Sequence, residues 1–273
     1  GHTGVIILDE ASMITESEVE KIRAFGLPVL LIGDYGQLPP VRSTMNRWMK
    51  NPDVILGENF RQHEASGIMQ AAMIARQTGH LGSGPYGDGA YAVSGRDMPA
   101  IYGVMSPDRL PPCPGNTIIA WRNEPRSRIN TGIHRALFPG AGRICCGDRV
   151  VALSNLPRMV MEKNDHGDWS GSGREEYVTN GTTGQVEHVI STGMKTADVI
   201  VRLDPGSLGN DSSPLVLARM SLDCLGSGRS LRPDEYAGEK WDYAYARTCH
   251  KAQGCEFQNV VVADCNRDPS WLY

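Results

Sequence analysis

The sequence contains six lysines, and none of them follows a glycine. A phosphate-binding loop of the form G-x-x-x-x-G-K-[ST] needs that pair, because its lysine and its loop amides together neutralise the phosphates of a nucleotide. The absence of the pair therefore excludes such a loop from all 273 residues. The glycine-rich stretch 82–89 cannot replace it, since it contains no lysine.

Paired cysteines and long apolar runs are also missing. None of the seven cysteines forms a C-x-x-C pair, which excludes a zinc ribbon or dithiol redox motif of that type. An odd number at irregular spacing is typical of reduced thiols, so we expect a cytoplasmic protein. No apolar stretch approaches the length of a membrane span, about 20 residues, and we expect no membrane partner. The start has neither a methionine nor a signal-peptide pattern, which indicates a fragment or a processed chain.

The charge balance shows no excess of positive charge. The formal net charge is −4, so the summed field does not attract a polyanion. Any contact with nucleic acid therefore has to come from local geometry. A hydrophobic content of 40% over 273 residues is enough for two compact domains.

The first part of the chain predicts a parallel strand–helix–strand unit. VIILD (5–9) is a short apolar run, typical of a strand that is buried on both faces. The segment 15–25 carries two overlapping capping boxes, Thr15 with Glu18 and Ser17 with Glu20, which predict a helix. VLLIGD (29–34) predicts a second buried strand, and the order of the three elements favours parallel pairing.

Later segments predict a second α/β region that is interrupted by short strands. A strand is expected at 116–123, a helix follows at 124–138, and QNVVVAD (258–264) predicts another buried strand. Between them, short alternating runs with turn signals such as Asn180-Gly181 predict a small β-barrel.

These elements predict an α/β protein with two parallel-sheet domains and a small barrel inserted in the second. Residues rich in glycine and proline separate the two domains. The expected divisions are 1–79 for the first domain, 80–115 for the inter-domain connection, 116–153 with 240–273 for the second domain, and 154–239 for the barrel.

Two adjacent carboxylates, Asp9 and Glu10, follow the first predicted strand. In a Mg-nucleotide site, an aspartate at this position holds the metal through its water shell, and the next glutamate orients and deprotonates the attacking water. The alternative is that the pair only caps a loop at a strand end. The apolar run before it and the sequence DEAS favour the metal site.

The second predicted strand leads into GDYGQLPPV (33–41). Its tip is expected beside the two carboxylates, on the side of a parallel sheet where ligands bind. The amide of Gln37 can contact a γ-phosphate there; the alternative is an ordinary loop rich in glycine and proline. In LGENFRQ (56–62), Arg61 is suited to the charge on a transferring phosphoryl group, although a lone arginine is more often a surface charge.

A fourth stretch is YARTCHKAQGCEF (245–257). The side chains of Thr248, His250 and Lys251 at the start of a helix can hold the backbone phosphates of a nucleic acid. His250 taken alone is equally consistent with a structural histidine whose hydrogen bonds are satisfied.

These four stretches, in this order, resemble motifs II, III, IV and V of superfamily 1 DNA helicases of the RecD/Dda type, in the UvrD/RecD-like group. The matching segments are DEAS, GDYGQLPPV, ENFRQ and TCHKAQGCEF. In addition, IIAWRN…GDRVVAL…NGTTGQV resembles the stretch between motifs IV and V, so the resemblance covers nearly the whole chain. It implies two RecA-like domains, the first incomplete, with a β-barrel inserted in the second.

The resemblance implies an ATP-dependent DNA helicase and translocase of a prokaryotic or phage-like context. Its ligands would be ATP and Mg²⁺, and its partner single-stranded DNA or a duplex junction, with 5′ to 3′ polarity. By position, it implies that Asp9 binds Mg²⁺ and that Glu10 is the general base. Gln37 would sense the γ-phosphate, and Arg61 would be an arginine finger.

The resemblance also implies two groups of binding residues. Those expected near the nucleotide are Asp34, Gly254 and Glu256. Those expected along the DNA track are Thr248, His250 and Lys251. The chain departs from the family at Ala252, where many relatives have a serine.

Two parts of such an enzyme are not in the sequence: the phosphate loop, and an arginine-bearing motif VI that would begin near SWLY (270–273). We therefore expect a fragment of a longer helicase that is inactive by itself. One alternative is a non-hydrolysing nucleic-acid-binding module that retains the helicase fold, although such a module has no use for Asp9, Glu10, Gln37 and Arg61. A different RNA or DNA remodeller would share the site and differ in its substrate.

Overall fold

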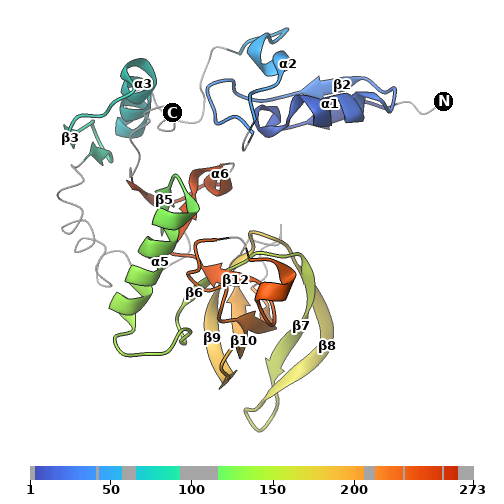
Figure 1. Ribbon diagram of the computed structural model, residues 1–273, viewed down its shortest axis with the longest axis vertical. Coiled ribbons are helices and arrows are strands. Elements are labelled where there is room, and N and C mark those ends of the chain that lie inside the picture. Colours follow the sequence, from blue (N-terminus) through green and yellow to red (C-terminus); the bar gives the residue numbers. More distant parts are fainter. Residues whose placement is uncertain are drawn as a thin grey trace. The chain divides into compact units, whose positions relative to one another are not determined.

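A computed structural model describes residues 4–40, 43–56, 66–92, 116–205, 213–229, 231–253 and 255–263. The chain is a mixed α/β protein that divides into two compact units, residues 1–98 with 266–273 and residues 99–265 (Figure 1). Within the described residues, no helix has the length and apolar composition needed to cross a membrane. The cysteines in this part of the chain are free thiols.

The first unit begins with the strand–helix–strand order that the sequence predicts. Strands β1 (Ile6–Leu8) and β2 (Val29–Leu31) pair in parallel, and α1 (Glu16–Arg23) connects them. Of the two predicted capping boxes, the first is confirmed: the Thr15 hydroxyl accepts a hydrogen bond from the Glu18 N–H, and the Glu18 carboxylate accepts one from the Thr15 N–H. Ser17, the cap of the other, lies inside α1. The helix therefore begins where the local sequence places it.

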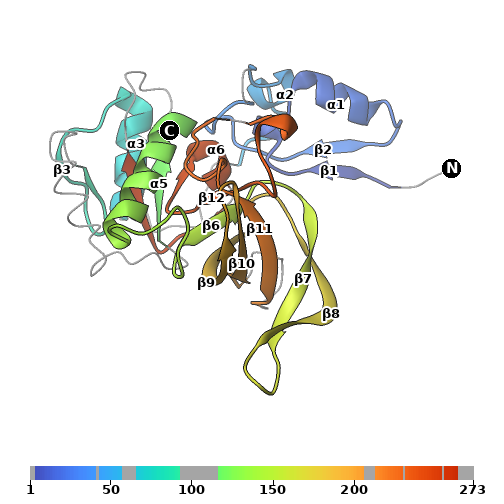
Figure 2. The ribbon, with the colours of Figure 1, turned by 60° about the horizontal axis from the view of Figure 1, so that its bottom comes forward.

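The prediction that both strands are buried is wrong. Ile7 is 57% exposed, and Leu30, its partner in the parallel register, is 48% exposed. Helix α1 packs along one side of the pair (Figure 2), and its Val19 is fully buried. Because side chains alternate along a strand, Ile7 and Leu30 face the other side, where the described residues leave them about half exposed. An apolar run indicates a strand, but its burial depends on a second covering layer.

Short elements make up the rest of the described first unit. Two helices follow, α2 (Arg47–Lys50) and α3 (Gly67–Thr78). Strands β3 (Gly84–Pro85) and β4 (Tyr91–Ala92) then pair in an antiparallel manner. This small hairpin falls within the predicted connection 80–115, whose later part lies outside the described residues.

The second unit contains a three-stranded parallel sheet in the order β13-β5-β14. Strand β5 (Asn116–Ala120) is central, and α5 (Asn123–Leu137) follows it, as the sequence predicts. The outer strands are β13 (Ala246–Thr248), which leads directly into α6 (Cys249–Ala252), and β14 (Asn259–Ala263).

The sequence predicts a buried strand at 258–264. The strand is present, but the prediction that it is buried is wrong. Val260 is 44% exposed and Val262 is 52% exposed. Strand β14 lies at an edge of its sheet, so only β5 pairs with it among the described strands. Alternate valines therefore lie on a side that the described residues do not cover.

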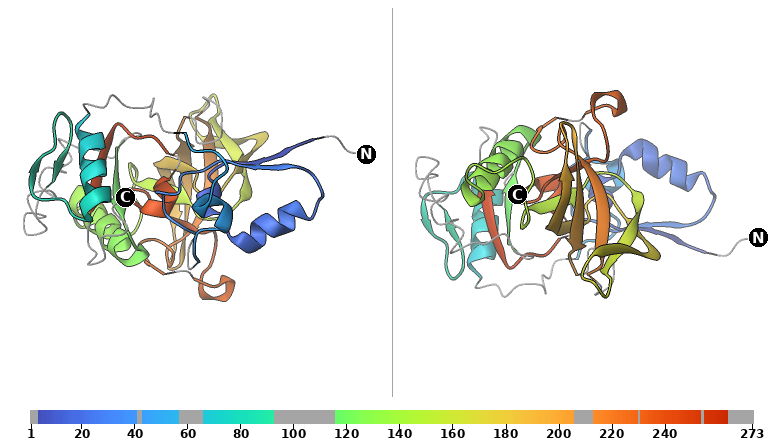
Figure 3. Two further views of the ribbon diagram at one scale, coloured as in Figure 1. Left: turned by 90° about the horizontal axis from the view of Figure 1, so that it is seen from above. Right: turned by 90° about the horizontal axis from the view of Figure 1, so that it is seen from below.

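Between β5 and β13 in the sequence, the chain forms a seven-stranded antiparallel sheet that curves strongly (Figure 3). Its order is β12-β6-β9-β10-β11-β7-β8. The sheet extends from Arg149 to Tyr243, on both sides of the predicted barrel segment 154–239. Its core includes Val199 and Trp241, both almost fully buried. The strands are β6 (Arg149–Ala152), β7 (Leu156–Lys163), β8 (Trp169–Val178), β9 (Thr183–Thr192), β10 (Thr196–Leu203), β11 (Leu215–Ser221) and β12 (Trp241–Tyr243).

The Asn180-Gly181 signal marks a real turn, and Gly181 has a φ of 101°. The strands on either side of this turn do not form a hairpin with each other. Within the described sheet, β8 pairs with β7, whereas β9 lies between β6 and β10. The local sequence thus predicts the turn, and the pairing is decided by contacts between distant segments.

Candidate functional site

Asp9 and Glu10 lie at the carboxyl edge of the β1–β2 pair. Leu8 pairs with Leu31 in parallel register, so Asp34 follows the neighbouring strand at the same edge. Ligands of parallel sheets bind at this edge, because loops from neighbouring strands converge there. The predicted neighbourhood of the two carboxylates and the 33–41 turn is therefore consistent with the strand register.

Glu10 has an unusual backbone conformation. Its φ of 51° and ψ of 38° are left-handed, and it is the only described residue other than glycine with a positive φ. That conformation costs an L-residue about 1–2 kcal/mol. Three hydrogen bonds hold it: the Glu10 N–H donates to Asp9 Oδ1 (2.9 Å), the Met13 N–H to the Glu10 carbonyl (3.0 Å), and the Ala11 N–H to the Ile32 carbonyl (2.8 Å). Strained positions of this kind concentrate at functional sites.

The loop after Glu10 is tied to α2 by Asn46, which is fully buried. Its Nδ2 donates to the carbonyls of Ala11 (2.8 Å) and Ile14 (2.9 Å), and its Oδ1 accepts the Met49 N–H (3.1 Å). All these groups of the amide are therefore paired, as a buried amide requires. Sequence reasoning missed Asn46, because asparagine before a helix indicates only a helix cap.

The turn that carries Gln37 is shaped by Asp34. The Asp34 carboxylate accepts the Gly36 N–H (2.8 Å), and its main-chain carbonyl accepts the Gln37 N–H (3.1 Å). Asp34 is thus occupied in forming the turn, and the nucleotide contact expected for it stays a prediction. Gln37 itself is half-buried.

Asp9 is the described residue that best suits a divalent cation at this edge. Its side chain is exposed, and Oδ1 accepts the Glu10 N–H. The second carboxylate oxygen can accept a hydrogen bond from metal-bound water, and Mg²⁺ prefers oxygen ligands and retains several waters. The chemistry of this donor therefore fits a hydrated magnesium ion.

Thr248, His250 and Lys251 lie at the carboxyl edge of the three-stranded sheet in the second unit. Thr248 ends β13 and pairs in parallel with Ala120, the last residue of β5. Trp121, which follows Ala120 directly, is therefore at the same edge. Thr248 and His250 are half-buried, and Lys251 is exposed.

Sequence reasoning gave no role to Trp121 and Arg122. The Arg122 guanidinium carbon lies 3.9 Å from the centroid of the Trp121 ring, a cation–π contact at the strand tip. The sequence feature that could have pointed to these two residues is the polar end of the predicted 116–123 strand. An aromatic ring beside a cation is suited to nucleic-acid contacts, since it offers a stacking surface and a phosphate partner together.

Helix α5 fixes the segment before Thr248 through polar side chains rather than through its apolar stripe alone. Arg126 pairs with the buried Asp242 (2.8 Å). One turn further on, the fully buried Asn130 donates to the carbonyls of Tyr243 and Ala246 and accepts the Ala246 N–H. These contacts place β13, and with it α6, relative to β5.

The next residue on this face of α5 is His134, which is buried. Its Nδ1 lies 2.8 Å from Asp148 Oδ1 and its Nε2 lies 2.9 Å from the Gly142 carbonyl. Both partners are acceptors, so the two hydrogen bonds form together only when the ring carries both protons and a positive charge. Burial opposes this charge, but the Asp148 carboxylate and the Gly142 carbonyl outweigh it and raise the pKa of His134.

His134, Cys145 and Asp148 are also close enough together to hold a metal ion. The carboxylate of Asp148, however, already accepts bonds from the Tyr245 hydroxyl (2.6 Å) and the Cys145 N–H (2.7 Å). Burial also raises the pKa of the Cys145 thiol, which disfavours the thiolate that a metal needs. The geometry is that of a structural hydrogen-bond network.

No protein-family model matches the chain, and no curated protein matches it in sequence. The family resemblance therefore rests on the motifs themselves. Arg61 and Gly254 lie outside the described residues, and their roles stay predictions. Glu256 is exposed in the segment between α6 and β14, and its proposed nucleotide contact is likewise untested.

Proposed function

We propose that the chain is part of an ATP-dependent DNA helicase that translocates on single-stranded DNA with 5′ to 3′ polarity and unwinds duplexes. The observation that carries the proposal is the strained backbone of Glu10, next to Asp9 and at the same sheet edge as the turn that presents Gln37. Because no lysine of the sequence follows a glycine, another part of the protein supplies the phosphate-binding loop in this proposal.

In this proposal, the β1–β2 pair and the three-stranded sheet belong to two RecA-like domains. The seven-stranded sheet is a barrel inserted in the second of them. Two observations support this interpretation. The β1–β2 pair and the three-stranded sheet are both parallel. The chain leaves the three-stranded sheet after β5 and α5, forms the seven-stranded antiparallel sheet, and returns at β13.

The proposal gives each candidate residue of the first unit a task in ATP hydrolysis. Mg²⁺, when bound, neutralises charge on the phosphates, and Asp9 would hold it through water. The Glu10 carboxylate orients the attacking water and accepts its proton. The Gln37 amide donates to the γ-phosphate, and Arg61 would stabilise the charge of the transferred phosphoryl group.

The second unit contributes contacts to the DNA strand. Thr248, His250 and Lys251 offer a hydroxyl, an imidazole and an ammonium group at one sheet edge, all able to donate to phosphate oxygens. Trp121 and Arg122 at the same edge add a ring for stacking and a further cation.

The test uses the complete gene product that contains these residues and two duplexes, one with a 5′ and one with a 3′ single-stranded tail. We expect ATP-dependent displacement of the strand from the 5′-tailed duplex only, and none with a non-hydrolysable ATP analogue. Binding to both tails without ATP hydrolysis would identify the non-hydrolysing module instead. Displacement from only the 3′-tailed duplex would contradict the proposed polarity.

A further inference from the structure

Two cysteines are adjacent at positions 145 and 146, in the segment between α5 and β6. They begin a four-residue turn, Cys145 to Asp148, which is closed by a hydrogen bond from the Asp148 N–H to the Cys145 carbonyl (3.1 Å). Gly147, the third residue of the turn, has a φ of 93°, which is typical of a type II turn. Both thiols are free, and the proposed function gives neither of them a role.

The two thiols differ in accessibility. Cys146 is exposed, whereas Cys145 is half-buried. Burial raises the pKa of the Cys145 thiol, and the nearby charges of Asp148 and Cys146 raise it further. Because the thiolate is the reactive form of a cysteine, a reagent in solution reacts first with the exposed Cys146. Cys145 is then the second thiol, and it reaches the modified sulfur without the approach of any distant segment.

A disulfide between consecutive residues is strained. Across a trans peptide the two Cα atoms are about 3.8 Å apart, whereas a disulfide usually joins Cα atoms about 4.4–6.8 Å apart. No peptide bond of the described residues is cis, so the ring can close only if the peptide between Cys145 and Cys146 leaves its present orientation. Strained and exposed disulfides are easily reduced again. The geometry therefore favours a reversible modification over a permanent cross-link.

The peptide that must rotate also closes the turn. Its oxygen is the Cys145 carbonyl that accepts the Asp148 N–H, and Asp148 is fully buried. The Asp148 carboxylate in turn accepts the Tyr245 hydroxyl (2.6 Å), and the same oxygen lies 2.8 Å from Nδ1 of His134 on α5. Rotation of the peptide removes the acceptor of a buried N–H, which is costly. It therefore loosens the residue that links α5 to the segment before β13.

We propose that Cys145 and Cys146 form a reversible disulfide that opens this turn and destabilises the second unit. The oxidant is a small-molecule disulfide such as glutathione disulfide. The Cys146 thiolate attacks one of its sulfur atoms, the bond between the two sulfurs breaks, and one glutathione leaves as a thiolate. The Cys145 thiol then loses its proton and attacks the Cys146 sulfur, which releases the second glutathione. Two thiols of the chain are oxidised and two glutathione thiols form, so electrons and protons balance. The reaction involves neither ATP nor nucleic acid and does not rest on the proposed function.

The test uses the peptide 144–149, which trypsin releases by cutting after Arg143 and Arg149 and which contains only these two cysteines. The 273-residue chain is equilibrated with mixtures of glutathione and glutathione disulfide, its free thiols are blocked with N-ethylmaleimide, and it is digested. As the share of glutathione disulfide rises, we expect the peptide to appear unblocked and two hydrogens lighter, and dithiothreitol to reverse the change. Over the same range the melting temperature of the chain is expected to fall by about 3 °C or more.

Two variants separate this pair from the other thiols. Cys146→Ser is expected to abolish both the lighter peptide and the fall in melting temperature. Cys255→Ser, which removes another exposed thiol, is the matched control and is expected to retain both. A peptide that stops at the mixed disulfide with glutathione would overturn the proposal, and so would a closed ring that leaves the melting temperature unchanged. An equal fall in Cys146→Ser would also overturn it, because another thiol would then be responsible.

Discussion

The side-chain amide of Asn46 donates a hydrogen bond of 2.8 Å to the main-chain oxygen of Ala11, 35 residues earlier in the chain. A second bond from the same nitrogen reaches the carbonyl of Ile14. Through this buried side chain, the loop that follows Asp9 and Glu10 is fixed to the start of α2. The position of the candidate catalytic carboxylate therefore depends on a residue outside the motif that contains it.

Replacement of Asn46 by alanine is expected to destabilise the first unit. Two carbonyls and the Met49 N–H lose their partner in a buried site, and each unpaired buried group costs about 1–3 kcal/mol. We expect the free energy of unfolding, measured with urea, to fall by about 2 kcal/mol or more. Asn51→Ala is the control, because Asn51 is exposed and is expected to change stability by less than about 0.5 kcal/mol. Equal effects of the two substitutions would contradict this role for Asn46.

His134 makes stability depend on pH. Its pKa is raised in the folded protein, mainly because the interactions with Asp148 and Gly142 outweigh the cost of burial. A raised pKa means that the contribution of His134 is complete below its unfolded pKa, about 6.5, and is lost as the pH rises through the folded value. Thermal unfolding of the second unit is therefore expected at lower temperature as the pH increases from 6. His134→Gln is expected to flatten this dependence, whereas the exposed His166→Gln is not; a profile unchanged by His134→Gln would contradict the charged ring.

The Arg149–Asp204 pair is expected to contribute far more than a surface pair. Arg149 Nη1 donates to Asp204 Oδ1 (2.8 Å), the Thr183 hydroxyl also donates to this carboxylate, and both charged side chains are nearly buried. Asp204→Ala leaves a buried guanidinium without its partner and is expected to cost about 3–5 kcal/mol. Glu187→Ala, which removes the exposed partner of Arg202, is expected to cost no more than about 1 kcal/mol. Urea unfolding measures how much each variant lowers the free energy of unfolding. Similar losses for the two variants would show that burial does not determine how much an ion pair contributes.

The 273-residue chain by itself is expected to hydrolyse ATP at no more than background rate. Its sequence has no lysine after a glycine, so nothing in it can form the phosphate-binding loop that holds the nucleotide. Phosphate release with and without single-stranded DNA measures this directly. A DNA-stimulated rate well above background would show that a phosphate-binding loop is not required.

Local signals predicted what depends on neighbouring residues. Thr15 and Glu18 are three residues apart, so their capping box is visible in the sequence, and the order of the first strands and helix favoured the parallel pairing that the structure has. The turn at Asn180-Gly181 was equally local. In each case the interaction lies within one short segment, and the residue types determine it.

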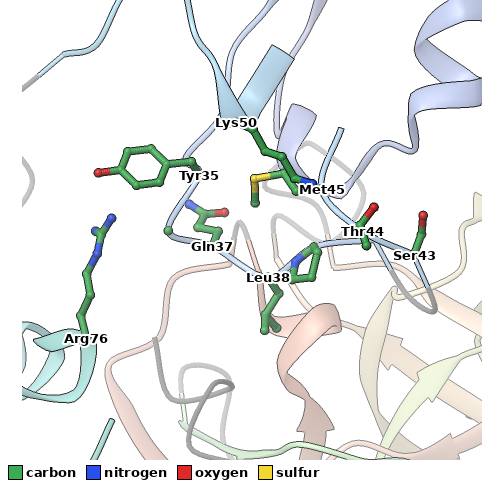
Figure 4. A pocket seen from close by; sticks show the side chains of 10 residues that line it. Tyr35, Gln37, Leu38, Ser43, Thr44, Met45, Lys50 and Arg76 are labelled. Atoms are coloured by element: carbon green, nitrogen blue, oxygen red, sulfur yellow. The ribbon is translucent and has the colours of Figure 1, made fainter. Parts of the chain in front are cut away.

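Several features that sequence reasoning missed involve contacts between residues far apart in the chain. Burial of β1 depends on which segments cover its second face, and the sequence of the strand itself does not show this. Ile7 is exposed because the described residues leave that face uncovered. The cation–π contact between Tyr35 and Arg76, in the lining of a pocket of about 680 Å³, joins a turn to a helix 41 residues later (76 − 35), with no shared motif (Figure 4). The roles of Asn46 and Asn130 could not be predicted either, because a buried amide is recognised by its hydrogen-bond partners and not by its neighbours in the chain.

The most direct test of the central claim is Glu10→Gln in the complete gene product, with Glu162→Gln as the control at an exposed position of β7. The substitution keeps the size of the side chain and removes the carboxylate that we propose as acceptor of the proton of the attacking water. We predict that Glu10→Gln abolishes DNA-stimulated ATP hydrolysis, leaves the affinity for ATP unchanged, and leaves the folded state intact. Retained hydrolysis, or an equal loss of ATP binding and hydrolysis, would contradict the claim that Glu10 is the general base.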